Sequence, residues 1–396
     1  MKWVKLGDII RITSGGTPLT SKREYYDNGT IRWVKTGDLK KQYLFETPDR
    51  ITQLGLENSS AKIFPINTVL IAMYGATIGN CSILKIAAST NQACAALLPT
   101  KNINEEYLYF YLRTIKQQLI DQGVGGGQPN ISATILKQTN FPLIPLGDQI
   151  QIANILSKAE ALIGQRKESL RLLDEFLRST FLEMFGDPVR NEKEWQKIMI
   201  SDVVMRLDAG KSIQSVEKEA AGKYKVLKTS SVSWGRFNKE EAKWLPLGYL
   251  PPKDHLIQKG DILMSRMNTT ELVGASTYVF DDVKNLALPD RIWKFILSKE
   301  NSVNPLFLWY CINWSSFRRV ISEMSSGTSG SMKNITKGSI LNLPLIYPDK
   351  YLQTQFAHIV EKTEALKAYY QTSLQELENL YGSLSQRAFK GKLNLK

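Results

Sequence analysis

Apolar residues recur at alternating steps of four and three along residues 147–186, and no proline interrupts this stretch. Such steps keep side chains on one face of a helix, so the pattern predicts a single long helix with a narrow apolar seam. At 1.5 Å per residue the helix would span roughly 55 to 60 Å. The seam consists of Ile152, Leu156, Ala159, Ile163, Leu170, Leu173, Leu177 and Met184, with Arg166 and Thr180 at its two polar steps.

A second copy of this seam follows, in which Phe356 takes the place of Ile152. Identical residues support the match, since Gln149 and Gln151 align with Gln353 and Gln355. Two narrow seams in one chain can bury each other as an antiparallel helix pair; the alternative is two separate amphipathic helices on the surface. The second seam consists of Phe356, Val360, Thr363, Lys367, Leu374, Leu377, Tyr381 and Ala388.

The segments before the two helices also repeat each other. Lys35-Thr36 corresponds to Lys228-Thr229, and in each segment β-type runs precede a helix, predicted over 105–122 and again over 304–317. We therefore predict an α+β chain made of a tandem internal repeat, in which two similar globular α/β domains are separated by two long antiparallel coiled-coil helices. The expected boundaries are 1–146, 147–187, 188–347 and 348–396.

The charge of the chain narrows the choice of partner. Its 396 residues include 51 Lys and Arg against 38 Asp and Glu, which gives a formal charge of +13. A polyanion is therefore the first partner to consider, although a merely basic soluble protein has the same balance. Cys81, Cys94 and Cys311 are odd in number and widely spaced, as expected of free thiols in a reducing compartment. Neither a signal peptide nor a membrane-spanning stretch is expected.

Catalytic patterns fail when they are tested residue by residue. The only histidines, His255 and His358, lie in unrelated contexts, which disfavours a catalytic triad or a metal site. Gly210-Lys211-Ser212 resembles the end of a phosphate-binding loop, but Met205 stands where that loop needs its first glycine. The tetrapeptide Asn-Pro-Pro-aromatic of amino-methyltransferases does not occur. We expect no catalytic residue and no metal ligand in this chain.

Loops in both globular segments combine cationic, amide and small side chains. Arg and Lys can bind guanine edges or phosphates, and Asn and Gln match adenine. Any one of these residues is more simply an ordinary solvated loop residue, but their recurrence at equivalent places in a basic chain favours nucleic-acid binding. The candidates are Lys35, Thr36, Asp38, Tyr74, Asn91, Gln92, Gln128 and Asn130 in the first segment, and Lys228, Thr229, Arg266, Asn268, Arg291, Lys333 and Asn334 in the second.

The order of segments and several short phrases together resemble the specificity subunits of type I restriction-modification systems. The phrases are Ser14-Gly15-Gly16-Thr17-Pro18, Trp33-Val34-Lys35-Thr36-Gly37-Asp38-Leu39, Gly75-Ala76-Thr77-Ile78-Gly79, Thr90-Asn91-Gln92-Ala93 and Pro142-Leu143-Ile144-Pro145-Leu146. The second segment departs from the first, with Ser230-Ser231 in place of Gly37-Asp38 and Met267-Asn268 in place of Tyr74-Gly75. Such divergence is what two different DNA targets would require.

The resemblance implies a cytoplasmic, non-catalytic DNA-binding subunit. Each target-recognition domain would read one half of an asymmetric bipartite site in double-stranded DNA, and the helices would set the gap. Two methyltransferase (modification) subunits would bring S-adenosylmethionine, and restriction/translocase subunits would bring ATP and Mg. The alternative is a non-catalytic repeat scaffold that binds another polyanion or an acidic protein. Helix pairing and partner docking are expected to involve Ile152, Leu156, Ile163, Leu170, Leu173, Leu177, Phe356, Val360, Leu374, Leu377 and Tyr381.

Overall fold

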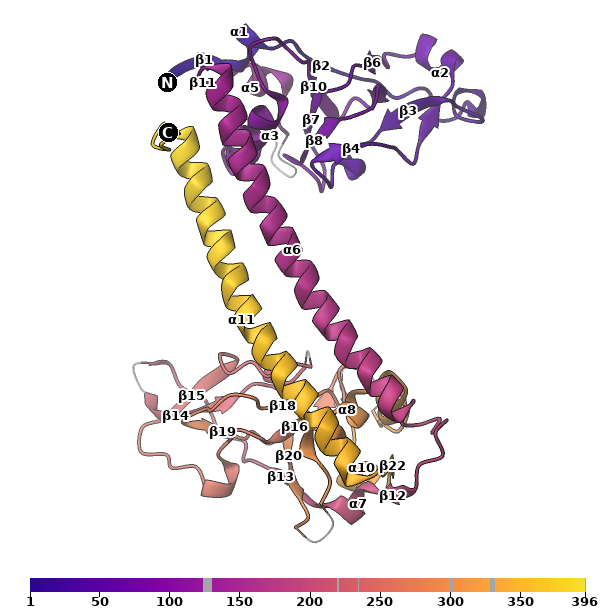
Figure 1. Cartoon of the computed structure of the whole chain (residues 1–396), viewed down its shortest axis with the longest axis vertical. Helices are drawn as coiled ribbons and strands as arrows, with labels where there is room; N and C mark the ends of the chain where they lie inside the picture. Colours follow the sequence, from indigo (N-terminus) through magenta and orange to yellow (C-terminus); the bar gives the residue numbers. More distant parts are fainter. Residues whose placement is uncertain (124–129, 219–220, 234, 300–301, 328–331, 396) are drawn as a thin grey trace. The chain divides into compact units, whose positions relative to one another are not determined.

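A computed structural model describes residues 1–123, 130–218, 221–233, 235–299, 302–327 and 332–395 (Figure 1). It divides into two compact units: unit 1 is Met1–Glu168 with Gln371–Lys396, and unit 2 is Ser169–Tyr370. The helices α6 (Leu146–Phe185) and α11 (Lys350–Phe389) are 40 residues long, and each contributes to both units. Every unit therefore contains one globular domain and a stretch of both long helices.

The globular domain of unit 1 is built on two small sheets. Apolar runs form their central strands, because a strand covered on both faces needs no polar side chain; β7 and β10 are buried at every position. One sheet has the order β2 (Ile12–Ser14), β10 (Cys94–Leu97), β7 (Val69–Ala72), β8 (Cys81–Leu84), β4 (Tyr43–Leu44). The other has the order β5 (Arg50–Ile51), β3 (Ile31–Val34), β9 (Ala88–Thr90), β6 (Ile63–Phe64).

Short helices and a terminal strand pair complete this domain. Strand β1 (Lys2–Lys5) pairs with β11 (Asn140–Leu143), directly before α6. The helices are α1 (Leu6–Ile9), α2 (Gln53–Glu57), α3 (Glu105–Thr114), α4 (Lys116–Asp121) and α5 (Ala133–Gln138).

Unit 2 repeats this plan. Its main sheet has the order β13 (Val204–Ala209), β20 (Ile292–Leu297), β16 (Ile262–Ser265), β18 (Ser276–Tyr278), and its second sheet has the order β15 (Ala242–Pro246), β14 (Ala221–Leu227), β19 (Leu286–Ala287). Strand β12 (Lys197–Met199) pairs with β22 (Pro344–Ile346), and β17 (Met267–Asn268) pairs with β21 (Lys333–Asn334). The helices are α7 (Ile200–Val203), α8 (Pro305–Asn313), α9 (Ser315–Glu323) and α10 (Lys337–Leu341).

The predicted internal repeat is confirmed by strand topology. The order β2-β10-β7-β8 in unit 1 has the same connectivity as β13-β20-β16-β18 in unit 2. In the second sheets, β3 pairs in parallel with β9 and β14 pairs in parallel with β19. The fold class is thus α+β with two similar domains.

The predicted single helices over 105–122 and 304–317 are each divided in two. The first breaks at Ile115, whose backbone (φ −96°, ψ 11°) leaves the helical region, and the second breaks at Trp314 (φ −62°, ψ 142°). The break redirects α4 and leaves Leu119 only 1% exposed. Apolar periodicity continues across each break, so the pattern alone does not reveal the change of direction.

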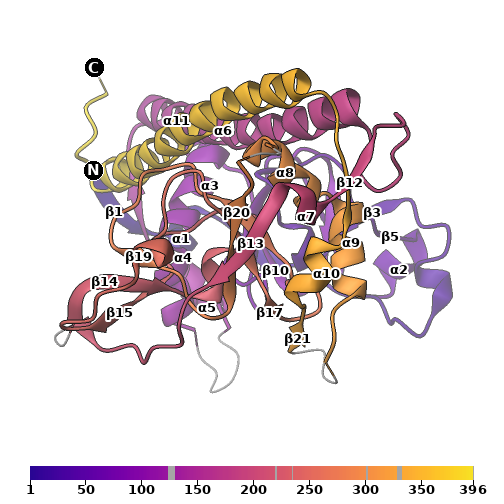
Figure 2. The same ribbon diagram turned by 90° about the horizontal axis from the view of Figure 1, so that it is seen from below.

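Within each unit, the segments of α6 and α11 that belong to it lie side by side and antiparallel (Figures 1 and 2). In unit 1, Lys167 forms an ion pair with Glu378 at 2.8 Å, and in unit 2, Asp174 forms one with Lys367 at 2.6 Å. Every residue of the predicted seams is buried or half-buried, including Lys367, which is 4% exposed. This arrangement is the antiparallel coiled coil that the two heptad patterns predict.

Each unit closes its core with the start of one long helix and the end of the other. In unit 1, Ile152 and Leu156 of α6 and Phe389 of α11 join the core around α3. In unit 2, Phe185 of α6 and Phe356 of α11 join the core around α8, with ring centroids 5.5 Å apart. The long helices are therefore integral parts of both domains.

A buried glutamine attaches each long helix to the inner helix of its domain. Gln149 accepts a hydrogen bond from the backbone N–H of Asn104 at 3.0 Å, and Gln353 accepts one from Asn304 at the same distance. Both glutamines are fully buried. The two asparagines cap α3 and α8 with their side chains. The sequence match between the glutamines thus reflects an equivalent hydrogen bond in the two domains.

Candidate nucleic-acid interface

Backbone hydrogen bonds gather the candidate loops of unit 1. The N–H of Asn91 donates to the carbonyl of Val34 at 3.0 Å, beside Lys35. The N–H of Met73 donates to Ala93 at 2.8 Å, and the N–H of Ile131 donates to Met73 at 2.7 Å. Residues far apart in sequence therefore meet at the ends of neighbouring strands. The candidates brought to this region are Lys35, Thr36, Asp38, Tyr74, Asn91, Gln92 and Asn130; Gln128 lies outside the described residues.

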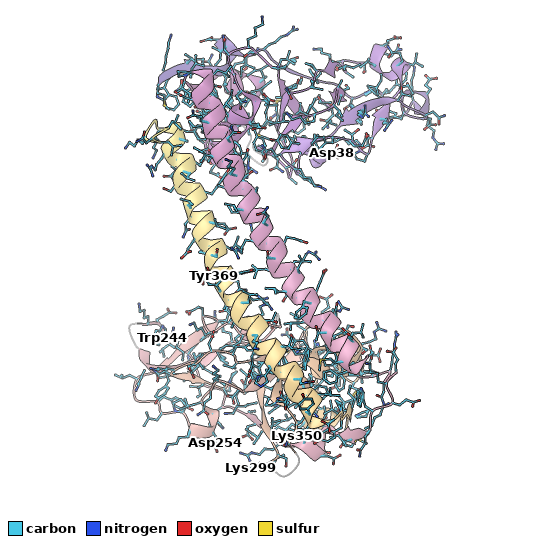
Figure 3. All side chains as sticks on the ribbon, viewed as in Figure 1. Asp38, Trp244, Asp254, Lys299, Lys350 and Tyr369 are labelled. Carbon is cyan, nitrogen blue, oxygen red and sulfur yellow. The ribbon has the colours of Figure 1, made fainter. Side chains whose placement is uncertain are left out.

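Some of these side chains are engaged within the loops. Lys35 forms an ion pair with Asp49 at 2.8 Å and lies 5.2 Å from the ring centroid of Trp33. Asp38 accepts a hydrogen bond from the backbone N–H of Lys35 at 2.8 Å, which closes the turn Thr36–Asp38. Gln92 is exposed and accepts a hydrogen bond from Thr17. Asp38, labelled in Figure 3, is thus part of the turn, while Gln92 remains exposed to solvent.

The candidate loops of unit 2 are gathered in the same manner. The N–H of Arg266 donates to the carbonyl of Arg291 at 3.0 Å, and the carbonyl of Arg266 accepts from the N–H of Ile335 at 3.1 Å. Asn268 lies opposite Lys333 in the β17–β21 pair, visible in Figure 2. Arg266, Asn268, Arg291, Lys333 and Asn334 therefore form one group.

An open cleft of about 380 Å³ connects the remaining candidates of unit 2, and we name it the reading cleft. It is lined by Lys228, Thr229 and Arg291, together with Lys211 and Lys243. Lys211 and Lys243 are not among the binding residues that the sequence predicts. Lys211 belongs to the rejected phosphate-loop pattern. Nothing in the local sequence distinguishes Lys243 from other lysines, and only the strand pairing places it opposite Val226.

Hydrogen bonds stabilise the ionised carboxylate of Glu241 beside the reading cleft. Ser230 donates to Glu241 at 2.6 Å, and Lys228 pairs with the same carboxylate at 3.3 Å. The hydrogen bond from Ser230 and the bond and charge of Lys228 hold the pKa of Glu241 below its ordinary value. Glu241 is therefore ionised at neutral pH and offsets the charge of Lys228.

Three candidate residues carry buried polar atoms that lack a hydrogen-bond partner among the described residues: Asn91 Oδ1, Arg266 Nε and Asn334 Oδ1. An unpaired buried polar atom costs about 1 to 3 kcal/mol. Both domains thus hold unused hydrogen-bonding capacity within the loop groups.

The described part of the chain has no group of three or more His, Cys, Asp or Glu residues placed to hold a metal ion. Among those residues, no helix has the length and apolar character that crossing a membrane requires.

Comparison with known proteins gives consistent matches. A family model described as the type I restriction modification DNA specificity domain matches residues 1–172 and 192–379. The chain is 23% identical over 411 residues to the type I restriction enzyme MjaVIII specificity subunit of Methanocaldococcus jannaschii, covering 99% of this chain and 93% of that protein. It is 24% identical over 377 residues to the EcoKI specificity subunit of Escherichia coli, covering 88% and 80%.

A further relative and a solved structure extend this picture. The MjaIX specificity subunit of M. jannaschii is 31% identical over 196 residues, which cover 48% of this chain and 45% of that protein. The crystal structure of a type I restriction-modification S subunit from M. genitalium matches with a TM-score of 0.61 and 13% identity, covering 100% of this chain and 97% of that one. At that identity the match supports the fold alone.

Proposed function

Because this chain belongs to the type I restriction-modification DNA specificity family, we propose that it reads an asymmetric, bipartite DNA site with one domain per half-site. One observation carries the proposal: the same strand topology occurs twice and presents two chemically different loop groups. Two copies of one frame with different loops are suited to two different half-sites.

The loop groups are the proposed DNA contacts. In unit 1, Lys35, Gln92 and Asn130 offer cationic and amide groups; in unit 2, the reading cleft and the β17–β21 pair offer Lys and Arg with Asn268 and Asn334. Cationic groups contact phosphates or guanine, and the amides can pair with adenine. Association should weaken strongly with salt, since phosphate contacts release counterions.

The chain is proposed to act without catalytic residues of its own, in the cytoplasm. Two methyltransferase subunits would supply S-adenosylmethionine and methyl transfer, and restriction subunits would supply ATP- and Mg-dependent steps. Exposed apolar side chains on the long helices support partner docking there, for example Leu172 (49% exposed) on α6 and Tyr369 (68% exposed) on α11 (Figure 3).

The decisive experiment is methylation profiling by long-read sequencing in cells that carry the partner methyltransferase, with and without this chain. We expect a split adenine-methylated motif only when the chain is present. A second specificity subunit in the same cells shows that the methyltransferase is active. If no motif depends on this chain while the control motif appears, the proposal is wrong.

A further inference from the structure

Unit 2 contains a second cationic cleft that none of the candidate loops occupies. It is open, has a volume of about 390 Å³, and is lined by Lys223, Lys225, Lys239, Lys284 and Trp244. Trp244 lies on β15, labelled in Figure 3. We name it the lysine cleft.

Strand register places the lysine cleft and the reading cleft on opposite faces of the β14–β15 ribbon. Lys225 lies opposite Trp244, and the next pair is Val226 opposite Lys243. Successive side chains of a strand point to opposite faces, so Lys225 and Trp244 share one face while Lys243 projects from the other. A ligand in the lysine cleft therefore contacts groups that the reading cleft does not reach.

Among the described residues, the four lysines of this cleft have no close carboxylate partner. Glu240 and Asp282 also line it, yet among the described residues none of the four lysines has a carboxylate within 4.0 Å. Lys225 instead lies 4.3 Å from the ring centroid of Trp244. Four cations against two carboxylates leave the lining with a net positive charge, which attracts an anion with several charges.

Other lysines of unit 2 show that pairing is available in this domain. Lys228, Lys294 and Lys367 each have a carboxylate within 4.0 Å, at Glu241, Asp261 and Asp174 respectively. The four lysines of the lysine cleft differ from these three, since no carboxylate of the described residues lies within 4.0 Å of them. Lys223 and Lys225 lie close in sequence and both line the cleft, so that neighbouring phosphates of one DNA strand can face them.

We propose that the lysine cleft binds the sugar-phosphate backbone of the DNA, at phosphates different from those at the reading cleft. It adds affinity that does not depend on sequence. This inference rests on the proposed function, because it requires that unit 2 binds DNA.

The test uses the chain assembled with its methyltransferase subunits and the variant Lys223→Gln/Lys239→Gln/Lys284→Gln. Lys225 is left in place to keep its contact with Trp244. Affinity is measured at several salt concentrations for DNA with the cognate site and for scrambled DNA. We expect both affinities to fall by a similar factor, roughly tenfold at moderate salt, and the slope of log K against log salt to decrease by about two to three.

Two controls separate charge from folding. Lys223→Arg/Lys239→Arg/Lys284→Arg keeps the charges and should keep both the affinity and the salt slope. Lys253→Gln/Lys259→Gln removes exposed lysines of unit 2 that line neither cleft and should change neither quantity.

Unchanged affinity and slope in the folded glutamine variant would overturn the inference. So would a loss confined to cognate DNA, or a changed methylated motif, since either result would make the cleft a reader of bases. Failure of the wild-type complex to bind any DNA would instead overturn the proposed function, and this inference with it.

Discussion

The first lysine of each loop group is held in the same way in the two units, although its surroundings differ. Lys35 pairs with Asp49 at 2.8 Å, and Lys228 pairs with Glu241 at 3.3 Å. Each lysine directly follows a strand, β3 in unit 1 and β14 in unit 2, and each acidic residue directly precedes the antiparallel partner of that strand, β5 or β15. The turn that follows is closed by Asp38 in unit 1, whereas Ser230 donates to Glu241 in unit 2.

Close backbone contacts explain why the frame persists while the loops differ. A Cβ atom on Gly15 would lie 2.0 Å from the carbonyl oxygen of Thr90, and one on Gly210 would lie 1.6 Å from that of Leu288. Neither position can hold a side chain without moving the backbone. By contrast, a Cβ atom on Gly37, in the turn after Lys35, would meet nothing within 4 Å. The comparison indicates a close-packed framework with more open positions in the loops.

The largest expected effect comes from exchanging residues 188–347 for the equivalent domain of a relative. Because unit 1 keeps its loops, only one half of the methylated motif should change. Methylation profiling of cells with the exchanged chain measures both halves at once. A change in both halves would show that the domains do not read independently.

Lengthening both long helices tests whether these helices, which both units share, set the gap between the two halves of the DNA site. One heptad is added to each helix between the Lys167–Glu378 and Asp174–Lys367 ion pairs, which keeps the seam in register. Seven residues add about 10 Å of helix, so the gap should widen by up to about three base pairs, with both halves unchanged. An unchanged gap in the methylated motif would contradict this role of the helices.

The buried glutamines allow the stabilities of the two units to be compared. Gln149→Leu and Gln353→Leu each leave buried backbone groups unpaired, and we expect each to cost about 2 to 4 kcal/mol of unfolding free energy. Gln149 also donates to two backbone carbonyls, against one for Gln353, so its loss should cost more.

Pulsed thiol alkylation during urea unfolding locates each effect. Cys81 and Cys94 report on unit 1 and Cys311 reports on unit 2, and all three are buried. The exposed neighbours Gln151 and Gln355 provide matched Gln→Leu controls with little expected effect. If the three thiols are alkylated at the same urea concentration in both Gln149→Leu and Gln353→Leu, the two units do not unfold separately.

The smallest expected effect concerns the end of α6, where the units differ. Burial raises the pKa of Asp187, but hydrogen bonds from the N–H of Arg190, from Ser316, from the N–H of Val189 and from Trp314 outweigh it and hold the pKa below 3.8. The carboxylate thus stabilises unit 2 above its unfolded pKa, and this stabilisation is lost as pH falls through the lower folded value.

Asp187→Asn should therefore destabilise unit 2 by about 1 to 2 kcal/mol at pH 7. The difference from wild type should shrink as pH falls below about 4. Urea unfolding followed by alkylation of Cys311 measures this difference in unfolding free energy. Asp281→Asn, at an exposed residue, is the control. A difference that stays constant down to pH 3 would assign the effect to packing.

The sequence alone determined the long helices, the duplication and the family. Heptad spacing is a local property of one helix, and a repeat is visible whenever residues such as Gln149 and Gln353 recur in order. These features needed no knowledge of which strand lies beside which. The candidate loops were also visible in part, because Lys35 and Lys228 occupy matching phrases.

Only the tertiary structure decided how the remaining residues act together. The role of Gln149 depends on Asn104, the N-cap of α3, 45 residues earlier in the chain, and the break at Ile115 accompanies the burial of Leu119. The two clefts depend on the register of β14 against β15, which turns Lys225 and Lys243 to opposite faces. Strand register is set by pairing between distant segments, and a shift of one residue would reverse both faces, so no local pattern could place them.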